Sequence, residues 1–292
     1  MSETTQVAHT REERTVPADT NYAIQLEHVT QVYQSSNGPF TAVKDVSLVC
    51  RQGEFVSLVG PSGCGKSTLL WLLSGLTTAH SGSVKVFGRE VDGVHRNVGL
   101  IVQRDALLPW KTALENVALP LRFRGASRRD AQAQSRQWLR RVGLQAFEDS
   151  YPHQLSGGMR KRVAIAATLS YEPKVLCMDE PFSSLDVQTR NLMENDLLEL
   201  WSGSGQTVLF ITHDLEEAVG LSDRVIVMTA SPGTVLGEHE VALPRPRDLL
   251  EDKLQPDFAA TYSNIWDHLR GEVLRAYRDA TATNTDNQPK DK

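Results

Sequence analysis

The segment GPSGCGKST, residues 60–68, combines three glycines, one lysine and three hydroxyl side chains within a short stretch. Its spacing matches G-x-x-x-x-G-K-[ST], in which glycines let the backbone curl until its N–H groups converge on phosphate oxygens. Lys66 would then reach the β- and γ-phosphates, and the Ser67 hydroxyl would reach Mg²⁺. The residues expected to bind a nucleotide in this phosphate loop are Gly60, Pro61, Ser62, Gly63, Cys64, Gly65, Lys66, Ser67 and Thr68.

Two adjacent acids, Asp179 and Glu180, follow the apolar run of KVLCMDEPF. Asp179 would end a buried strand close to the phosphate loop, where an aspartate holds Mg²⁺, usually through its water shell. Glu180 would point elsewhere, because successive side chains of a strand alternate, and could polarise a water in line with the γ-phosphate. The alternative is a strand that merely ends in solvated acids; the phosphate loop upstream favours the metal and base interpretation.

The elements that position these residues can be predicted from hydrophobic patterns. The buried-strand run EFVSLV precedes the phosphate loop and the helical pattern TLLWLLSGL follows it, which predicts a strand–loop–helix unit. Residues 22–51 are β-rich and partly alternating. Further buried-strand runs are NVGLIVQ, KVLCMDE, QTVLFITH and RVIVMTA, and helical patterns separate several of them. Strands that alternate with helices predict a mainly parallel α/β sheet.

The remaining segments differ in composition. Residues 104–169, rich in Arg, Ala, Gln and Leu, predict a mostly helical insertion into the sheet domain. Residues 246–278 predict a helical extension whose amphipathic helix packs against the protein's own surface. The apolar residues at helical spacing in it are Ile265, Leu269, Val273 and Leu274. Residues 1–21 and 279–292 are polar, which predicts disorder at both ends.

Composition excludes several classes of protein. The chain of 292 residues carries a net charge of −5, which disfavours a nucleic-acid binder. The spacing of Cys50, Cys64 and Cys177 fits neither a disulfide framework nor a zinc site, as expected for a cytosolic protein. Cys64 has no evident partner as a nucleophile, so we interpret it as a small residue filling the loop. No apolar run approaches the roughly 18 residues of a membrane span.

Taken in order, these motifs resemble the nucleotide-binding subunit of ABC transporters over residues 24–241. The resemblance implies a P-loop NTPase (RecA-like) α/β core with an antiparallel β subdomain and an inserted helical subdomain. The ATPase domain would span residues 22–245. LSGGM, residues 155–159, resembles the family signature LSGGQ, with Met159 in place of glutamine. Ser156, Gly157 and Gly158, which would meet phosphate, are unchanged, and the cations after them are expected where negative charge arrives.

The resemblance also implies roles for single residues, with ATP and Mg²⁺ as cofactors. Tyr33 would stack on adenine; Phe40 is a weaker candidate, and a tyrosine packed within a strand is the alternative. Asp186, in SSLD, would contact the partner subunit at the nucleotide. The implied catalytic residues are Glu180, His213 near the γ-phosphate, and Gln103, which would join Mg²⁺ and the attacking water to a hinge. The implied metal ligands are Ser67, Gln103 and Asp179.

The stretches RDALLPWKTALENV and THDLEEAVGLSDRVIVM resemble the nitrate, sulfonate and taurine group of importer ATPases. The resemblance implies a homodimer beneath two permease subunits, peripheral on the cytoplasmic face of the bacterial inner membrane. An extracytoplasmic binding protein would deliver the substrate. The permeases would contact the region Leu107–Trp110, although internal packing of Leu108 and Trp110 is the alternative. A soluble non-transport ABC ATPase and an exporter ATPase remain alternatives, and the sequence leaves the substrate open.

Overall fold

The computed structural model describes residues 21–36 and 38–285, with side chains described up to residue 278. A first sheet contains four antiparallel strands in the order β2-β1-β4-β5. They are β1 (Tyr22–Ser35), β2 (Gly38–Arg51), β4 (Ser81–Val86) and β5 (Arg89–Glu90). In β2, buried Val46, Leu48 and Cys50 alternate with less buried residues, as the partly alternating sequence predicts, whereas β1 is buried at the four successive residues 23–26.

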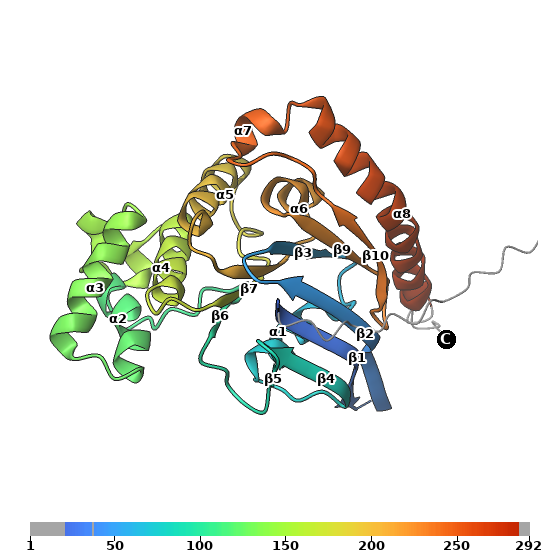
Figure 1. The fold of residues 1–292 in the computed structure, drawn as a ribbon, viewed down its shortest axis with the longest axis horizontal. Helices are drawn as coiled ribbons and strands as arrows, with labels where there is room; N and C mark the ends of the chain where they lie inside the picture. Colours follow the sequence, from blue (N-terminus) through green and yellow to red (C-terminus); the bar gives the residue numbers. More distant parts are fainter. Residues whose placement is uncertain (1–20, 37, 286–292) are drawn as a thin grey trace, which may run out of the picture.

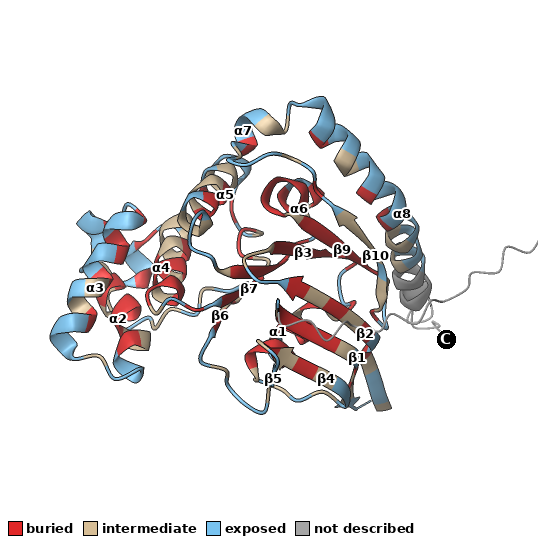
Figure 2. Cartoon of the chain, viewed as in Figure 1, coloured by how far each residue is buried: buried red, intermediate tan, exposed pale blue. Residues whose placement is uncertain are grey.

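The second sheet has six strands in the order β10-β9-β3-β8-β7-β6, and β10 alone among these six is antiparallel to its neighbour. The strands are β3 (Phe55–Val59), β6 (Val98–Ile101), β7 (Val175–Asp179), β8 (Thr207–Ile211), β9 (Arg224–Met228) and β10 (Val235–Glu240). Strands β3, β8 and β9 are buried along their whole length, and Figure 2 shows this for β3 and β9. Parallel strands covered on both faces read as continuous apolar runs, which is why the sequence identified them.

Helices cover the parallel sheet and join it to the antiparallel one. Helix α1 (Lys66–Ser74) contacts β4 of the first sheet and β6, β7 and β8 of the second. Its leucines share one apolar cluster with residues of β1, β2 and β3, so α1 fills the space between the two sheets. Helix α5 (Val187–Trp201) belongs to the core on the other face, and α6 (Leu215–Leu221) packs on β3 and β9.

The segment between β6 and β7 forms a helical group at the side of the sheets (Figure 1). It contains α2 (Ala113–Phe123), α3 (Arg128–Arg141), two 3₁₀ turns (Gln145–Phe147 and Pro152–Gln154) and α4 (Gly157–Leu169). The side chains of Trp138 and Leu139 join the core that also holds α4 and α5. The helices predicted for the insertion are therefore present and are anchored to the sheet domain mainly through α4.

The chain then leaves β10 for α7 (Leu249–Asp252) and the long helix α8 (Pro256–Thr285), which runs along one side of the molecule (Figure 1). Helix α8 lies on α6, β9 and β10 and buries Phe258, Ile265 and Leu269. Val273 packs at the edge of this contact, whereas Leu274 is 46% exposed and does not belong to the packed face. The expectation that the amphipathic helix packs on the protein's own surface agrees with these contacts.

The two predicted disordered ends differ from the structure at the inner limit of each. Residues 1–20 and 286–292 lie outside the described residues, while Asn21 is placed and accepts a backbone hydrogen bond from Gln52. Residues 279–285, predicted as part of a disordered tail, are instead the last part of α8. Helix extension costs little once a packed helix exists, even through a segment with three threonines. The prediction ended the helix too early because it used polarity alone.

Candidate functional site

The phosphate loop connects β3 to α1, as the strand–loop–helix pattern predicts. Gly65 has φ of 92°, and a side chain there would come within 2.7 Å of the Ala42 carbonyl oxygen, so only glycine fits. Lys66 is 6% exposed, and its ammonium donates to the carbonyl oxygens of Gly60 (2.8 Å) and Pro61 (3.0 Å). The loop therefore holds the lysine tightly at the N-terminus of a helix, where anions bind favourably.

A cavity of about 400 Å³ opens over this loop. It is lined by Tyr33, Phe40, Ala42, Ser62, Gly63, Gly65, Lys66, Ser67, Thr68, Gln103 and Glu180. The two aromatic candidates, Tyr33 and Phe40, lie directly opposite each other in the β1–β2 register. Tyr33 is half-buried and its hydroxyl donates to Thr68 Oγ1 at 3.5 Å, whereas Phe40 is 47% exposed. Both rings are available to a base, and Tyr33 is the one tied to the phosphate loop.

Asp179 ends β7, and its carboxyl lies near the Ser67 hydroxyl. Burial raises the pKa of the Asp179 carboxyl, with Glu180 adding to the rise, while the nearby Ser67 hydroxyl and Lys66 act in the opposite direction. A buried carboxylate beside a hydroxyl supplies hard oxygen ligands of the kind that Mg²⁺ prefers. Among the described residues no group of three or more His, Cys, Asp and Glu side chains forms a metal site. The pair fits a cation that phosphate oxygens help to hold.

Glu180 receives two side-chain contacts on one oxygen. Its Oε2 lies 3.2 Å from Gln103 Nε2, which donates to it, and 3.1 Å from His213 Nδ1. Gln103 follows β6 and His213 follows β8, so the ends of three strands bring these groups together. Glu180 has φ of 42°, in the left-handed region that non-glycine residues adopt at a cost of about 1–3 kcal/mol. Such strain persists where the surrounding structure fixes the residue for a task.

The signature segment lies apart from this cavity. Ser156 caps α4, because its hydroxyl accepts from the Met159 backbone N–H at 3.3 Å. Met159 packs its side chain against the main core. Of the predicted nucleotide contacts, Ser156, Gly157 and Gly158 are absent from the lining of the cavity over the phosphate loop, although all three are described. One copy of the chain therefore does not bring its own signature to its own phosphate loop.

The three cations after the signature each have an acidic partner within the chain. Arg160 lies 3.0 Å from Asp105, and the ammonium of Lys161, which is 1% exposed, lies 3.3 Å from the same carboxylate. Lys161 also donates to the Gln103 carbonyl oxygen at 3.1 Å. Arg162 pairs with Asp196 at 2.8 Å. These contacts tie α4 to the segment after β6, and the local sequence showed no sign of the partners.

Asp186 caps α5, and its carboxylate accepts from the Thr189 backbone N–H at 3.0 Å, which lowers its pKa. Sequence reasoning did not single out two residues near it, Arg190 and Asp214. Arg190 donates to Asp214 Oδ2 at 3.1 Å and to the Leu185 carbonyl oxygen at 3.1 Å. Arg190 lies four residues after Asp186 and outside the quoted motifs, whereas Asp214 lies next to His213 within THDLEEAVGLSDRVIVM but was given no role.

The region Leu107–Trp110 is a fixed loop with one projecting side chain. Asn116, 6% exposed, accepts from the Leu108 N–H at 2.8 Å and donates to the carbonyl oxygens of Leu108, Lys111 and Thr112. Leu107 packs against the main core, but Trp110 is 69% exposed. Internal packing therefore accounts for Leu107 and partly for half-buried Leu108, and it does not account for Trp110.

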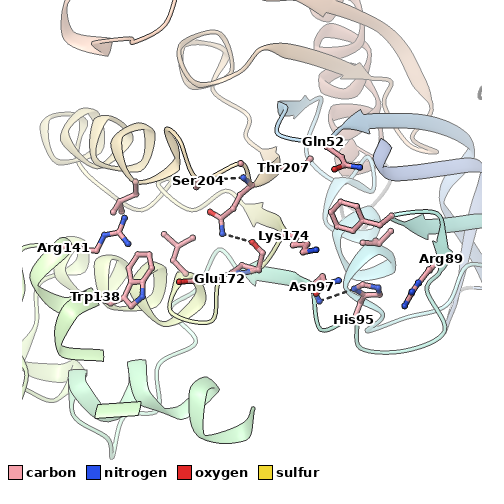
Figure 3. A pocket seen from close by; sticks show the side chains of 17 residues that line it. Gln52, Arg89, His95, Asn97, Trp138, Arg141, Glu172, Lys174, Ser204 and Thr207 are labelled. Carbon is pink, nitrogen blue, oxygen red and sulfur yellow. Dashed lines mark hydrogen bonds between the residues drawn. The ribbon is translucent and has the colours of Figure 1, made fainter. Parts of the chain in front are cut away.

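A larger cavity, of about 940 Å³, lies elsewhere (Figure 3). Its walls include Asn97, Lys174 and Thr207, which precede or begin β6, β7 and β8. It therefore opens at the amino ends of the parallel strands, opposite the edge that carries the phosphate loop. Ligands of open α/β sheets bind at the carboxyl ends, so the smaller cavity is the candidate nucleotide site.

The fold and the site define a P-loop NTPase: a mainly parallel sheet with a glycine-rich loop, a buried lysine and a strand-end aspartate at one edge. Comparisons with known proteins agree. The ABC transporter family model matches residues 43–183. The nitrate import ATP-binding protein NrtD of Synechocystis sp. is 39% identical over 253 residues, covering 85% of this chain and 95% of that protein.

The bicarbonate transport ATP-binding protein CmpD of Synechococcus elongatus is 41% identical over 233 residues, covering 78% of this chain and 84% of that protein. A solved structure, described as a dimeric post-hydrolysis state of an ATP-binding cassette bound to ADP and Pi, is 34% identical with a TM-score of 0.68. It covers 76% of this chain and 100% of that one. The chain belongs to the ABC transporter ATP-binding family and is an ATPase, which confirms the predicted family, fold class and enzyme class.

Proposed function

We propose that this protein is the ATP-hydrolysing subunit of an importer for a small anionic or organic solute such as nitrate, sulfonate or taurine. The observation that carries the mechanism is the separation of the phosphate-loop cavity from Ser156, Gly157 and Gly158. If the signature binds phosphate but cannot reach the phosphate loop of its own chain, it needs the phosphate loop of a second copy of the chain. In a two-fold dimer, each signature would close over the ATP held by the other subunit, giving two equivalent sites.

The phosphate loop would bind ATP through its backbone N–H groups, with Lys66 exchanging its carbonyl partners for β- and γ-phosphate oxygens. Charged hydrogen bonds of this kind contribute about 1.5–3 kcal/mol each. Tyr33 would stack on adenine at the mouth of the cavity. Ser67, Asp179 and Gln103 would hold Mg²⁺, which would neutralise the charge on the phosphates. Burial of Asp179 beside the Ser67 hydroxyl supports this assignment.

Glu180 would accept a proton from the water that attacks the γ-phosphorus, as the bond to the β-phosphate oxygen breaks. Its Oε2 is held between Gln103 and His213, so its orientation is set before the nucleotide arrives. His213, 57% exposed, can turn from Glu180 toward the γ-phosphate. Gln103 lies on the segment that Lys161 and Asp105 tie to α4, so the same residues could link hydrolysis to movement of the helical group.

The proposed partners follow from the same geometry. The second copy would dock on the signature and on the loop before α5 that contains Asp186. Two permease subunits would contact the region Leu107–Trp110, where Trp110 projects from a loop held by Asn116. The protein would thereby lie at the cytoplasmic face of a membrane, and an extracytoplasmic binding protein would deliver the solute. In the described residues no helix has the length and apolar character of a membrane span.

The test is Glu180→Gln, which keeps the shape of the side chain and removes the base. We expect ATP binding to persist while turnover falls at least about 100-fold, the size of a lost general base. ATP should then trap a dimer, measured by light scattering beside the ATPase assay. Turnover close to wild type would contradict the role of Glu180, and a monomer in saturating ATP would contradict the shared site.

Identifying the solute requires a transport measurement, because a relative named for nitrate import and one named for bicarbonate transport are almost equally similar to this chain. Uptake of each labelled anion by vesicles that contain the chain with its permease would name it. Export from the same vesicles would overturn the importer, and failure of the chain to assemble with any permease would favour a non-transport ATPase.

A further inference from the structure

Arg190 stands at a junction that the proposed mechanism does not use. It lies in the first turn of α5, directly after the loop 182–186, and its backbone N–H donates to the Asp186 carbonyl oxygen at 2.9 Å. Its guanidinium folds back so that Nη2 donates to the Leu185 carbonyl oxygen at 3.1 Å. One of the two terminal nitrogens of the forked guanidinium group is therefore bound to the loop that would face the partner subunit.

The other terminal nitrogen is bound to the segment after β8. Arg190 Nη1 donates to Asp214 Oδ2 at 3.1 Å, and the two side chains are 21% and 31% exposed. Asp214 also caps α6, because its Oδ1 accepts from the Glu216 backbone N–H at 2.8 Å. Asp214 directly follows His213, whose ring contacts Glu180. One guanidinium thus connects the loop before α5 to the residue that adjoins the catalytic histidine.

The surroundings of Arg190 favour arginine over any other cation. Its Nε atom is buried and lies 3.7 Å from Glu217 Oε1. The side chain of Glu194, one turn further along the same helix, is also buried. The ammonium of Lys253, from the C-terminal extension, reaches Glu194 at 3.7 Å from the other side. A planar guanidinium can serve a carbonyl and a carboxylate in fixed directions at once, which the compact ammonium of lysine cannot reproduce.

We propose that Arg190 is a positioning residue for ATP hydrolysis: it holds the loop 182–186 and the His213 segment at one spacing, so that docking of the partner subunit on that loop fixes the position of His213 beside Glu180 and the γ-phosphate. The inference rests on the role proposed for His213. It assigns Arg190 no contact with nucleotide. Loss of the fork should leave ATP binding intact and slow the chemical step, because the phosphate loop is untouched and only the alignment of His213 changes.

The experiment uses two conservative variants of the full chain. Arg190→Lys keeps the charge that faces Glu217 and Glu194 but loses the fork. Asp214→Asn keeps a good cap for α6 and places an amide against the guanidinium. Each should lower kcat about 10-fold with KM for ATP within about 2-fold, and the double variant should be no worse than either one, because both break one interaction.

Arg245→Lys is the matched control. Arg245 also joins a carboxylate, Asp223 at 2.7 Å, to a carbonyl oxygen, that of Leu221 at 2.8 Å, and it contacts none of the residues at the nucleotide site. Its kcat should stay at the wild-type value. Tm measured for every variant separates a loss of folded protein from a loss of rate, since a structural role alone would lower Tm without changing kcat per folded molecule.

Wild-type kcat in both Arg190→Lys and Asp214→Asn would overturn the inference, as would an equal loss in Arg245→Lys. His213→Ala, assayed in parallel, distinguishes the role proposed for His213 from the role proposed for Arg190. If His213→Ala remains active, the proposed role of His213 fails. If His213→Ala is inactive while Arg190→Lys is fully active, only the positioning role of Arg190 fails.

Discussion

At the residue scale, the chemistry at the nucleotide site depends on short-range patterns and on conformations that those patterns do not show. The order strand, glycine-rich loop and helix was enough to predict that Lys66 and Ser67 begin a helix after the loop, because each step of that motif is local. Glu180 was predicted from its place after Asp179, but its φ of 42° was not. The alternation of strand side chains breaks down there, because the strand has already ended at Asp179.

The two aromatic residues of the β1–β2 hairpin give a prediction at this scale. Stacking of an aromatic ring on a base contributes about 1–3 kcal/mol, so Tyr33→Ala should weaken ATP binding roughly 10-fold. Tyr33→Phe keeps the ring and loses only the hydroxyl contact with Thr68, and should bind ATP as the wild type does. Phe40→Ala should have a smaller effect than Tyr33→Ala. Titration with a fluorescent ATP analogue ranks the three; a larger loss in Phe40→Ala would assign the stacking to Phe40.

At the element scale, the sequence predicted the helix that follows the signature but not what its cations do. Arg160 and Lys161 find Asp105, and Arg162 finds Asp196, each far away along the chain. A run of cations at a helix start looks ready for phosphate when only neighbours in sequence are considered. The pairing of Arg160 and Lys161 with Asp105 depends on the packing of α4 against the segment after β6, and a local pattern does not contain such tertiary contacts.

The packing of α5 against α6 and α7 gives a prediction about pH. Glu194, on α5, is fully buried, and neither of its carboxylate oxygens has a hydrogen-bond partner among the described residues. Burial raises the pKa of Glu194 to about 8, and Glu217 adds to the rise, while Lys253 and Arg190 oppose it. The unfolded chain would release this proton near its ordinary pKa of 4.5, so the folded state binds more protons in between.

Folding stability should therefore fall as pH rises from about 4.5 toward 8, as far as Glu194 is concerned. Glu194→Gln removes the titrating group, and its Tm should decline less than that of the wild type between pH 6 and pH 8. Glu199→Gln, an exposed position on the same helix, is the control and should follow the wild type. Parallel Tm profiles for wild type and Glu194→Gln would show that Glu194 is ionised already at pH 6.

At the scale of the whole molecule, the helical group and the C-terminal helix lie on different sides of the two sheets (Figure 1). The helical group stands at one side of the sheets, with α8 along another, and the phosphate loop lies at the edge where the parallel strands end. The sequence predicted these parts and their order, since each has its own composition. It ended α8 too early, and it identified Ile265 and Leu269 as part of the packed face of that helix but not α6 and β9 as the elements they pack against.

Trp110 tests whether the helical group is the side that meets the membrane subunits. Its ring is 69% exposed on a loop fixed by Asn116, so Trp110→Ala should leave the fold and the ATPase activity of the isolated chain unchanged. Loss of a central exposed aromatic typically costs at least 2 kcal/mol of binding, so the complex with a permease should weaken at least about 30-fold. Trp266→Ala, on α8 and 38% exposed, is the control and should keep the complex. Co-purification and solute uptake measure both variants; a Trp110→Ala chain that retains complex and uptake would move the permease contact elsewhere on the molecule.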